Sequence, residues 1–120
     1  VKELTDEGIN VSFGSDDIFD PWNPLGNAKM RDQVFMGLYT GHMLGYEEIV
    51  NSYRFVTTNA ARTLHLGDAY GIGEGKEANF VILDAKNWYD ALNFDAPILR
   101  NYRKGKLIAS TAPVNTQVFF

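Results

Sequence analysis

Val11-Ser-Phe-Gly-Ser-Asp-Asp-Ile-Phe-Asp-Pro-Trp-Asn-Pro-Leu-Gly26 is the most informative part of this chain. It continues an apolar run over Ile9–Phe13, in which polar residues alternate with apolar ones, and this alternation predicts a β-strand. Gly14 then ends the strand and permits a tight turn. Carboxylates and aromatic side chains follow at once: Asp16, Asp17, Phe19, Asp20 and Trp22. Acidic residues just beyond the carboxyl end of a strand lie where α/β proteins place their catalytic groups.

The composition is that of a globular domain of 120 residues, with 45% hydrophobic and 22% charged residues. The net charge of −4 and the lack of a basic cluster argue against a nucleic-acid surface, because no group of cations is present to neutralise phosphates. The chain has no cysteine, and no apolar run approaches the roughly 20 residues of a membrane helix. We therefore expect a cytoplasmic protein with neither a nucleic acid nor a membrane as partner.

The first part of the chain predicts several helices around this strand. Lys2–Gly8 is typical of the end of a helix that stops at a glycine, which suggests that further chain precedes it. Asn27 is a candidate N-cap for a helix over Ala28–Leu44, with Gly45 as its stop. A second helix is expected over Tyr46–Val56.

A short third helix is expected over Ala60–Leu64, with Asn59 as its cap. His42 falls inside the first long helix and His65 in the turn after the third. Neither histidine has a second metal ligand two or four positions away, so we expect both to be structural.

The second part of the chain predicts β-structure after a glycine-rich boundary at Gly67–Gly75. Ala78–Leu83 is a continuous apolar run, typical of a strand buried on both faces. A helical turn is expected over Asn87–Asn93. A hairpin is expected to join strands at Ile98–Tyr102 and Leu107–Ser110 through a turn at Gly105, and a last strand could occupy Val114–Phe120.

The stretch Gly8–Gly26 resembles the last barrel strand and the following loop of bacterial cytosine deaminases, which belong to the amidohydrolase superfamily. The similarity continues in order along the chain, through Met36-Gly-Leu38, Leu44-Gly-Tyr46, Asn59-Ala-Ala-Arg-Thr-Leu64, Tyr70-Gly-Ile72, Glu77-Ala-Asn-Phe-Val-Ile-Leu83 and Gly105-Lys-Leu-Ile-Ala-Ser-Thr111. Two residues depart from the pattern. Ser15 stands where the family usually has His, and Asn79 stands where the superfamily usually has Asp.

This resemblance implies an α/β fold, in which the chain is the C-terminal part of a metal-dependent (β/α)8 barrel plus part of a small β-sandwich. Residues 1–66 would form the last strand, the active-site loop and the following helices of the barrel. Residues 67–120 would form the C-terminal portion of the sandwich. The family's histidine ligands would lie outside this chain, so we expect the isolated fragment to be inactive and to bind no metal tightly.

The resemblance also implies a reaction and its residues. The parent enzyme would convert cytosine, or a related cyclic amidine, to uracil and ammonia by means of a water activated by iron or zinc. Asp16 would be a metal ligand and the proton acceptor. Asp17 would hydrogen-bond the substrate ring, and Trp22 would form a wall of the pocket.

Other interpretations remain open beside this one. An Asp pair after a strand is more often a turn or a helix cap than a catalytic site, and Trp22 alone would be an ordinary packing residue. The parent could be another amidohydrolase, such as a hydantoinase-like enzyme or a different cyclic-amidine deaminase. The chain could also be a non-catalytic β module or scaffold. For the deaminase we expect a small-molecule pyrimidine as partner, and a homo-oligomer, since open strand edges recruit other chains.

Overall fold

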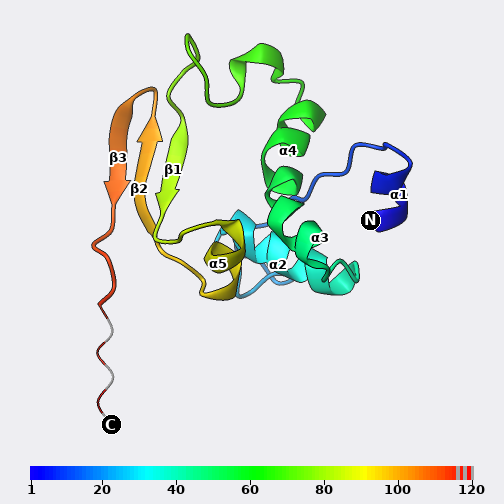
Figure 1. Ribbon diagram of the computed structural model, residues 1–120, viewed down its shortest axis with the longest axis horizontal. Coiled ribbons are helices and arrows are strands. Elements are labelled where there is room, and N and C mark those ends of the chain that lie inside the picture. Colours follow the sequence, from blue (N-terminus) through cyan, green and yellow to red (C-terminus); the bar gives the residue numbers. More distant parts are fainter. Residues whose placement is uncertain (116, 118, 120) are drawn as a thin grey trace. The chain divides into compact units, whose positions relative to one another are not determined.

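The computed structural model describes residues 1–115, 117 and 119, and these form two compact units, Val1–Asp68 and Ala69–Phe120. The first unit is built of helices and an extended segment. The second unit contains a three-stranded antiparallel sheet and one α-helix (Figure 1). Within the residues that the structure describes, no helix has the length and apolar character needed to cross a membrane.

Helix α1 spans Lys2–Asp6 and ends as its sequence predicts. Gly8 takes a left-handed conformation with φ +76°, and the N–H of Ile9 donates to the carbonyl of Leu4 at 2.9 Å. This is the hydrogen-bond pattern of a Schellman motif, which suits a glycine because it has no Cβ to clash. The ammonium of Lys2 also lies 2.6 Å from a carboxylate oxygen of Glu48.

The prediction of a strand at Ile9–Phe13 is wrong for this structure. These described residues are extended but form no strand. They lie against the short 3-10 helix η1 (Ser52–Val56) and helix α4 (Thr58–Thr63), and the N–H of Phe13 donates to the carbonyl of Phe55 at 2.9 Å. A strand needs a neighbouring strand to complete its ladder, and this segment bonds to helical residues instead.

Helix α2 spans Met30–Thr40 and is shorter at both ends than the predicted Ala28–Leu44. Ala28 has φ +58°, which excludes it from a right-handed helix, and Lys29 is the N-cap. Asn27 is therefore not the N-cap. Its Oδ1 accepts a hydrogen bond from the N–H of Lys29 at 2.9 Å.

The C-terminal end of α2 is a second Schellman motif. His42 has φ +52°, and the N–H of Met43 donates to the carbonyl of Leu38 at 2.9 Å. Leu38 and Met43 are both buried, so burial of the two side chains favours this early stop over continuation to Leu44. His42 thus lies just beyond the helix, and its predicted position inside the helix is wrong.

This geometry predicts a measurable difference between two substitutions. Because a left-handed residue with a Cβ costs roughly 1–2 kcal/mol, we expect His42→Gly to be more stable than His42→Ala by about 1 kcal/mol. Urea unfolding of the two variants measures this difference. An alanine variant as stable as the glycine variant would contradict the assigned turn.

The predicted helix Tyr46–Val56 is divided into α3 (Tyr46–Asn51) and η1. Ser52 is fully buried, and its hydroxyl donates to the carbonyl of Ile49 at 2.7 Å. Such a bond from a serine to the preceding turn competes with the regular helical pattern, which explains the tighter 3-10 turn that follows. At the other end, the carboxylate of Glu48 accepts the N–H of Gly45 at 2.8 Å, which is half of a capping box.

Helix α4 (Thr58–Thr63) begins two residues earlier than the predicted Ala60–Leu64. Asn59 therefore lies inside the helix and is not its N-cap. Its side chain reaches the extended segment and donates to the carbonyl of Val11 at 2.8 Å. The helix ends at Thr63. His65, two residues later, has φ +56°, and the N–H of Leu66 donates to the carbonyl of Ala61 at 3.0 Å.

The second unit follows the short 3-10 helix η2 (Gly67–Ala69). Its sheet has the order β1-β2-β3, with all pairs antiparallel (Figure 1). The strands are β1 (Phe80–Leu83), β2 (Ile98–Arg103) and β3 (Lys106–Ser110), and α5 (Trp88–Asn93) lies between the first two in sequence. The predicted helical turn and hairpin are therefore confirmed.

The turn between β2 and β3 has two left-handed residues, Lys104 with φ +51° and Gly105 with φ +74°. Positive φ at both central positions is the signature of a type I′ turn, which fits the twist of a hairpin. One prediction fails in this sheet. Val81 and Ile82 are 49% and 40% exposed, so β1 is not buried on both faces.

The predicted strand Val114–Phe120 includes residues 116, 118 and 120, which lie outside the described residues. Its described residues have no strand assignment.

Asn79 has a clear structural role, although the superfamily usually has Asp there. Its Oδ1 accepts the N–H of Lys104 at 2.8 Å, and its Nδ2 donates to the carboxylate of Glu77 at 3.2 Å. This donation lowers the pKa of Glu77, and the ammonium of Lys104 acts in the same direction. An ionised Asp could accept the first bond but could not donate the second.

Candidate functional site

The acidic loop that follows the extended segment is held closed by its own side chains. One carboxylate oxygen of Asp20 accepts the N–H groups of Trp22 at 2.9 Å and Asn23 at 2.7 Å. The Nδ2 of Asn23 donates to the carbonyl of Asp17 at 3.0 Å. An aspartate that accepts backbone N–H groups two and three residues later is typical of tight turns, so Asp20 shapes this loop.

The loop closes at Gly26, a residue that sequence reasoning did not single out. The N–H of Gly26 donates to the carbonyl of Asn23 at 3.1 Å. A Cβ at this position would lie 1.9 Å from the carbonyl oxygen of Ile18, far inside the contact distance of real atoms. Only glycine allows this close approach. The signal in the sequence was the glycine after two prolines, which predicts a turn but does not show what it contacts.

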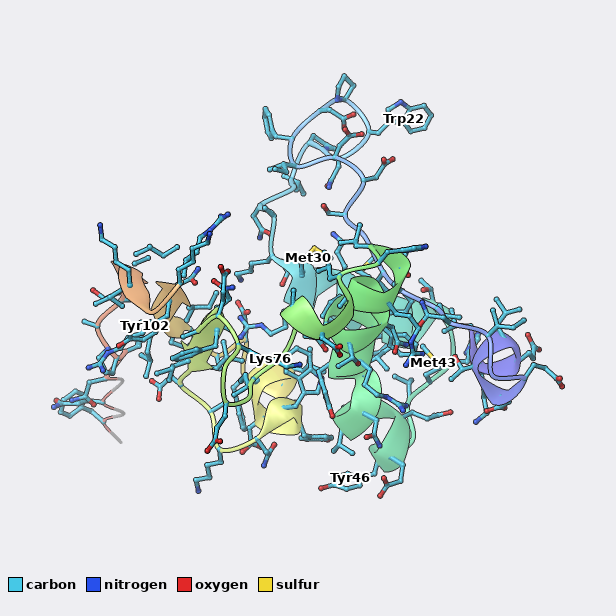
Figure 2. All side chains as sticks on the ribbon, turned by 90° about the horizontal axis from the view of Figure 1, so that it is seen from above. Trp22, Met30, Met43, Tyr46, Lys76 and Tyr102 are labelled. Atoms are coloured by element: carbon cyan, nitrogen blue, oxygen red, sulfur yellow. The ribbon has the colours of Figure 1, made fainter. Side chains whose placement is uncertain are left out.

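The three predicted site residues belong to this loop. Asp16 and Asp17 are both exposed, and Asp16 has φ +59°. Trp22 is 93% exposed, and Figure 2 shows its ring at the tip of the loop, pointing away from the helices of its own unit. The side chains of Asp17 and Asp20 are hydrogen-bonded, and the carboxylate of Asp16 is near enough to Asp17 to affect its pKa. The roles of Asp16, Asp17 and Trp22 in a reaction stay predictions.

The carboxylates influence one another's protonation. A hydrogen bond with the side chain of Asp20 raises the pKa of Asp17, and partial desolvation and the charge of Asp16 raise it further. The pKa of Asp20 is lowered, first by the hydrogen bond from the backbone of Asn23. The pKa values of the two carboxyl groups are thus shifted in opposite directions, that of Asp17 upward and that of Asp20 downward.

This pairing predicts a change in titration. In Asp20→Asn, the new amide can still accept the two backbone N–H groups and can donate to Asp17, so we expect the pKa of Asp17 to fall. Titration of the carboxyl carbon signals by NMR measures it, and an unchanged or higher pKa would show that the pair is not hydrogen-bonded.

The lowered pKa of Asp20 also gives the loop a pH dependence. A lowered pKa in the folded state stabilises the fold above the unfolded value, and this contribution is lost as the pH falls through the folded value. We therefore expect the loop to open in acid, at pH values below the ordinary range of an aspartate.

The backbone before the loop is fixed by aromatic packing. The rings of Phe13 and Phe55 stack with centroids 4.6 Å apart and planes at 18°. The ring of Phe13 also packs directly on Gly37 of α2. A Cβ at Gly37 would clash with Cε2 of this ring. Phe55 is 5% exposed, so this contact forms part of the buried core of the first unit.

The metal that the resemblance implies would need ligands from elsewhere. Among residues 1–115, 117 and 119 there is no group of three or more histidines or carboxylates that could hold a metal ion. The two histidines occupy left-handed positions at the ends of α2 and α4. The exposed carboxylate of Asp16 fits one oxygen ligand of a zinc or iron site, which uses three or more protein ligands.

The chain matches known proteins along nearly all of its length. The model of the family described as "Amidohydrolase family" matches residues 1–111. The crystal structure of 5-methylcytosine deaminase from Klebsiella pneumoniae liganded with phosphonocytosine is 45% identical, covers 98% of this chain and has a TM-score of 0.91. The same deaminase liganded with 5-fluorocytosine gives 44% identity, the same coverage and a TM-score of 0.92.

The names of two less similar relatives refer to a different substrate, N-isopropylammelide. N-isopropylammelide isopropyl amidohydrolase from Pseudomonas sp. (strain ADP) is 29% identical over 108 residues, which cover 90% of this chain. The structure of N-isopropylammelide isopropylaminohydrolase from Burkholderia multivorans is 26% identical, covers 92% of this chain and has a TM-score of 0.80. The chain spans 27% of the length of the Pseudomonas relative and 28% of each of these solved chains.

Proposed function

The chain belongs to the amidohydrolase family, and on that premise we propose that it is the C-terminal part of a metal-dependent deaminase of cytosine or a closely related pyrimidine. The observation that carries the proposal is the 45% identity to 5-methylcytosine deaminase over 98% of this chain. That identity far exceeds the identity to the N-isopropylammelide enzymes. It favours a pyrimidine ring as the small-molecule substrate.

The two units fit this proposal. Residues 1–66 would end a (β/α)8 barrel, in which Ile9–Phe13 would pair as the last strand once its neighbours are present. Residues 67–120 would contribute the three strands β1, β2 and β3 to a small β-sandwich. The acidic loop would then lie at the carboxyl end of a barrel strand, which is where barrel enzymes carry out their chemistry.

Asp16 is the central residue of the proposed mechanism. It would hold a divalent metal, iron or zinc, together with histidines from the rest of the enzyme. The metal, when bound, would supply a water of lowered pKa. The carboxylate of Asp16 would accept a proton from the attacking water and return it to the departing amine, so that the oxygen adds to the amine-bearing ring carbon, the carbon–nitrogen bond breaks and ammonia leaves.

Asp17 and Trp22 would serve the substrate. The carboxyl group of Asp17 is exposed and is able to hydrogen-bond a substrate ring. The side chain of Trp22 is 93% exposed in the described structure, so its indole ring is available to stack on a flat substrate ring. Both roles follow the resemblance to the deaminase loop and the position of the residues on it.

Ammonia release by the full-length enzyme tests the proposal. The metal-loaded protein is incubated with cytosine, 5-methylcytosine and N-isopropylammelide. We expect turnover of at least one of the two pyrimidines and little or none of the third compound. Turnover of N-isopropylammelide alone would replace the pyrimidine assignment with that of the more distant relatives, and turnover of none would overturn it. Residues 1–120 alone serve as the control and should release no ammonia.

A further inference from the structure

The extended segment Asn10–Phe13 is clamped to one helix of its unit by a group of hydrogen bonds. The Nδ2 of Asn59 donates to the carbonyl of Val11 at 2.8 Å. In return, the Nδ2 of Asn10 donates to the carbonyl of Asn59 at 3.2 Å. The hydroxyls of Ser12 and Thr63 lie 2.9 Å apart. The segment that leads directly to Asp16 is therefore fixed before the acidic loop begins.

Asn59 of α4 bonds through its side chain to the backbone of this segment. In an extended chain, the backbone groups of residues two apart point to the same side. The carbonyl of Val11 bonds to Asn59 and the N–H of Phe13 bonds to the carbonyl of Phe55, so one edge of the segment is held at two successive points. Thr63 contacts the side chains of the segment instead.

The amide of Asn59 is not used as a helix cap. Helix α4 begins after Thr57, which provides no side-chain cap, and Asn59 lies in the first helical turn. An asparagine there is a poorer helix former than alanine. The hydrogen bond from Asn59 to Val11 does not stabilise the helical turn itself. It connects α4 to a segment that is distant in sequence.

We propose that Asn59 is a positioning residue for Asp16, and this inference rests on the deaminase function proposed above. By holding the carbonyl of Val11, Asn59 sets the direction in which the chain leaves the helices and enters the loop. The stacked rings of Phe13 and Phe55 hold the other end of the segment. When the Val11 contact is lost, the segment can tilt about the stacked rings, which moves the carboxylate of Asp16.

The test uses Asn59→Asp in the full-length enzyme. This change keeps the size of the side chain but replaces the donating NH₂ with an accepting oxygen, which faces the carbonyl of Val11. We expect kcat to fall by roughly 10- to 100-fold, because a displacement of about 1 Å in a site can cost 10²-fold. KM should change by less than about threefold, since Asn59 does not touch the substrate.

Two further variants separate positioning from general damage. Asn59→Gln keeps a donating amide and should recover a large part of kcat relative to Asn59→Asp. Thr63→Val removes the hydroxyl that contacts Asn10 and Ser12 while it leaves the Val11 contact intact, so kcat should stay near normal. Equal losses in all three variants, or a change in KM alone, would overturn the inference.

Hydrogen–deuterium exchange gives a readout that does not depend on activity. The N–H of Phe13 is bonded to Phe55, and we expect it to exchange faster in Asn59→Asp but at the normal rate in Thr63→Val. If the wild-type enzyme deaminates no pyrimidine, the proposed function fails while this measurement still tests the clamp. Normal exchange of Phe13 together with normal kcat in Asn59→Asp would overturn the role of Asn59.

Discussion

Replacing Asp16 with asparagine is expected to lower kcat of the full-length enzyme by about 10²–10⁴-fold, before any loss of metal is counted, because the proposed proton acceptor of the attacking water is removed. Asparagine is the appropriate substitution since Asp16 has φ +59°, a left-handed conformation that Asn adopts at lower cost than Ala. The loss of activity can then be assigned to the missing carboxylate rather than to a strained backbone. Steady-state kinetics on cytosine and 5-methylcytosine measure it.

The matched control for this change is Asp68→Asn. Asp68 is exposed and lies in η2, away from the acidic loop in sequence. The Asp68→Asn variant loses the same charge outside the acidic loop, so the kcat of this variant should stay near the wild-type value. A near-normal rate for Asp16→Asn would remove Asp16 from the mechanism.

The second large effect is expected from Gly26→Ala. The added methyl group would lie 1.9 Å from the carbonyl oxygen of Ile18, so the acidic loop must open to admit it. Opening moves the backbone that carries Asp17 and Asp20, and we expect kcat/KM to fall by about 10²-fold, as a shift of about 1 Å in a site can produce.

Gly14→Ala is the control for the loop. Gly14 precedes the same loop, and no atom outside its neighbouring residues lies within 4 Å of the position that a Cβ would take. The substitution adds the same methyl group without the clash, so it should have a much smaller effect. Equal effects of the two substitutions would mean that crowding at Gly26 is not what the activity depends on.

The sequence predicted local features well where the cause is local. Gly8 and Gly105 take the left-handed conformations that a helix end and a hairpin turn require. The helical turn predicted over Asn87–Asn93 contains α5, which begins after Asn87, whose Oδ1 accepts the N–H of Asp90 at 2.9 Å. In each case the residue type and the conformation depend on only a few neighbouring residues.

Prediction failed where contacts distant in sequence determine the outcome. Asn59 is a good cap by residue type, but its side chain bonds to Val11 instead, and no local pattern reveals that partner. Likewise, a left-handed His42 ends α2 early, because Met43 turns back to be buried beside Leu38. Histidine at such a position carries none of the signal that glycine does.

The candidate site was only partly accessible from the sequence. The run of acidic residues identified the loop, and its resemblance to deaminases suggested the reaction. The closed shape of the loop depends on Asp20, Asn23 and Gly26, whose contacts appear only in three dimensions. The unequal pKa values of Asp17 and Asp20 follow from that shape.

We propose that Asp16 binds the catalytic metal of a larger deaminase. A crystal structure of the full-length, metal-loaded enzyme with phosphonocytosine would decide this. We predict a carboxylate oxygen of Asp16 at about 2.0–2.2 Å from the metal, the distance of an Asp–zinc bond, with Asp17 in hydrogen-bond contact with the pyrimidine ring. A metal held entirely by other residues, with the carboxylate of Asp16 well beyond bonding distance, would contradict the claim.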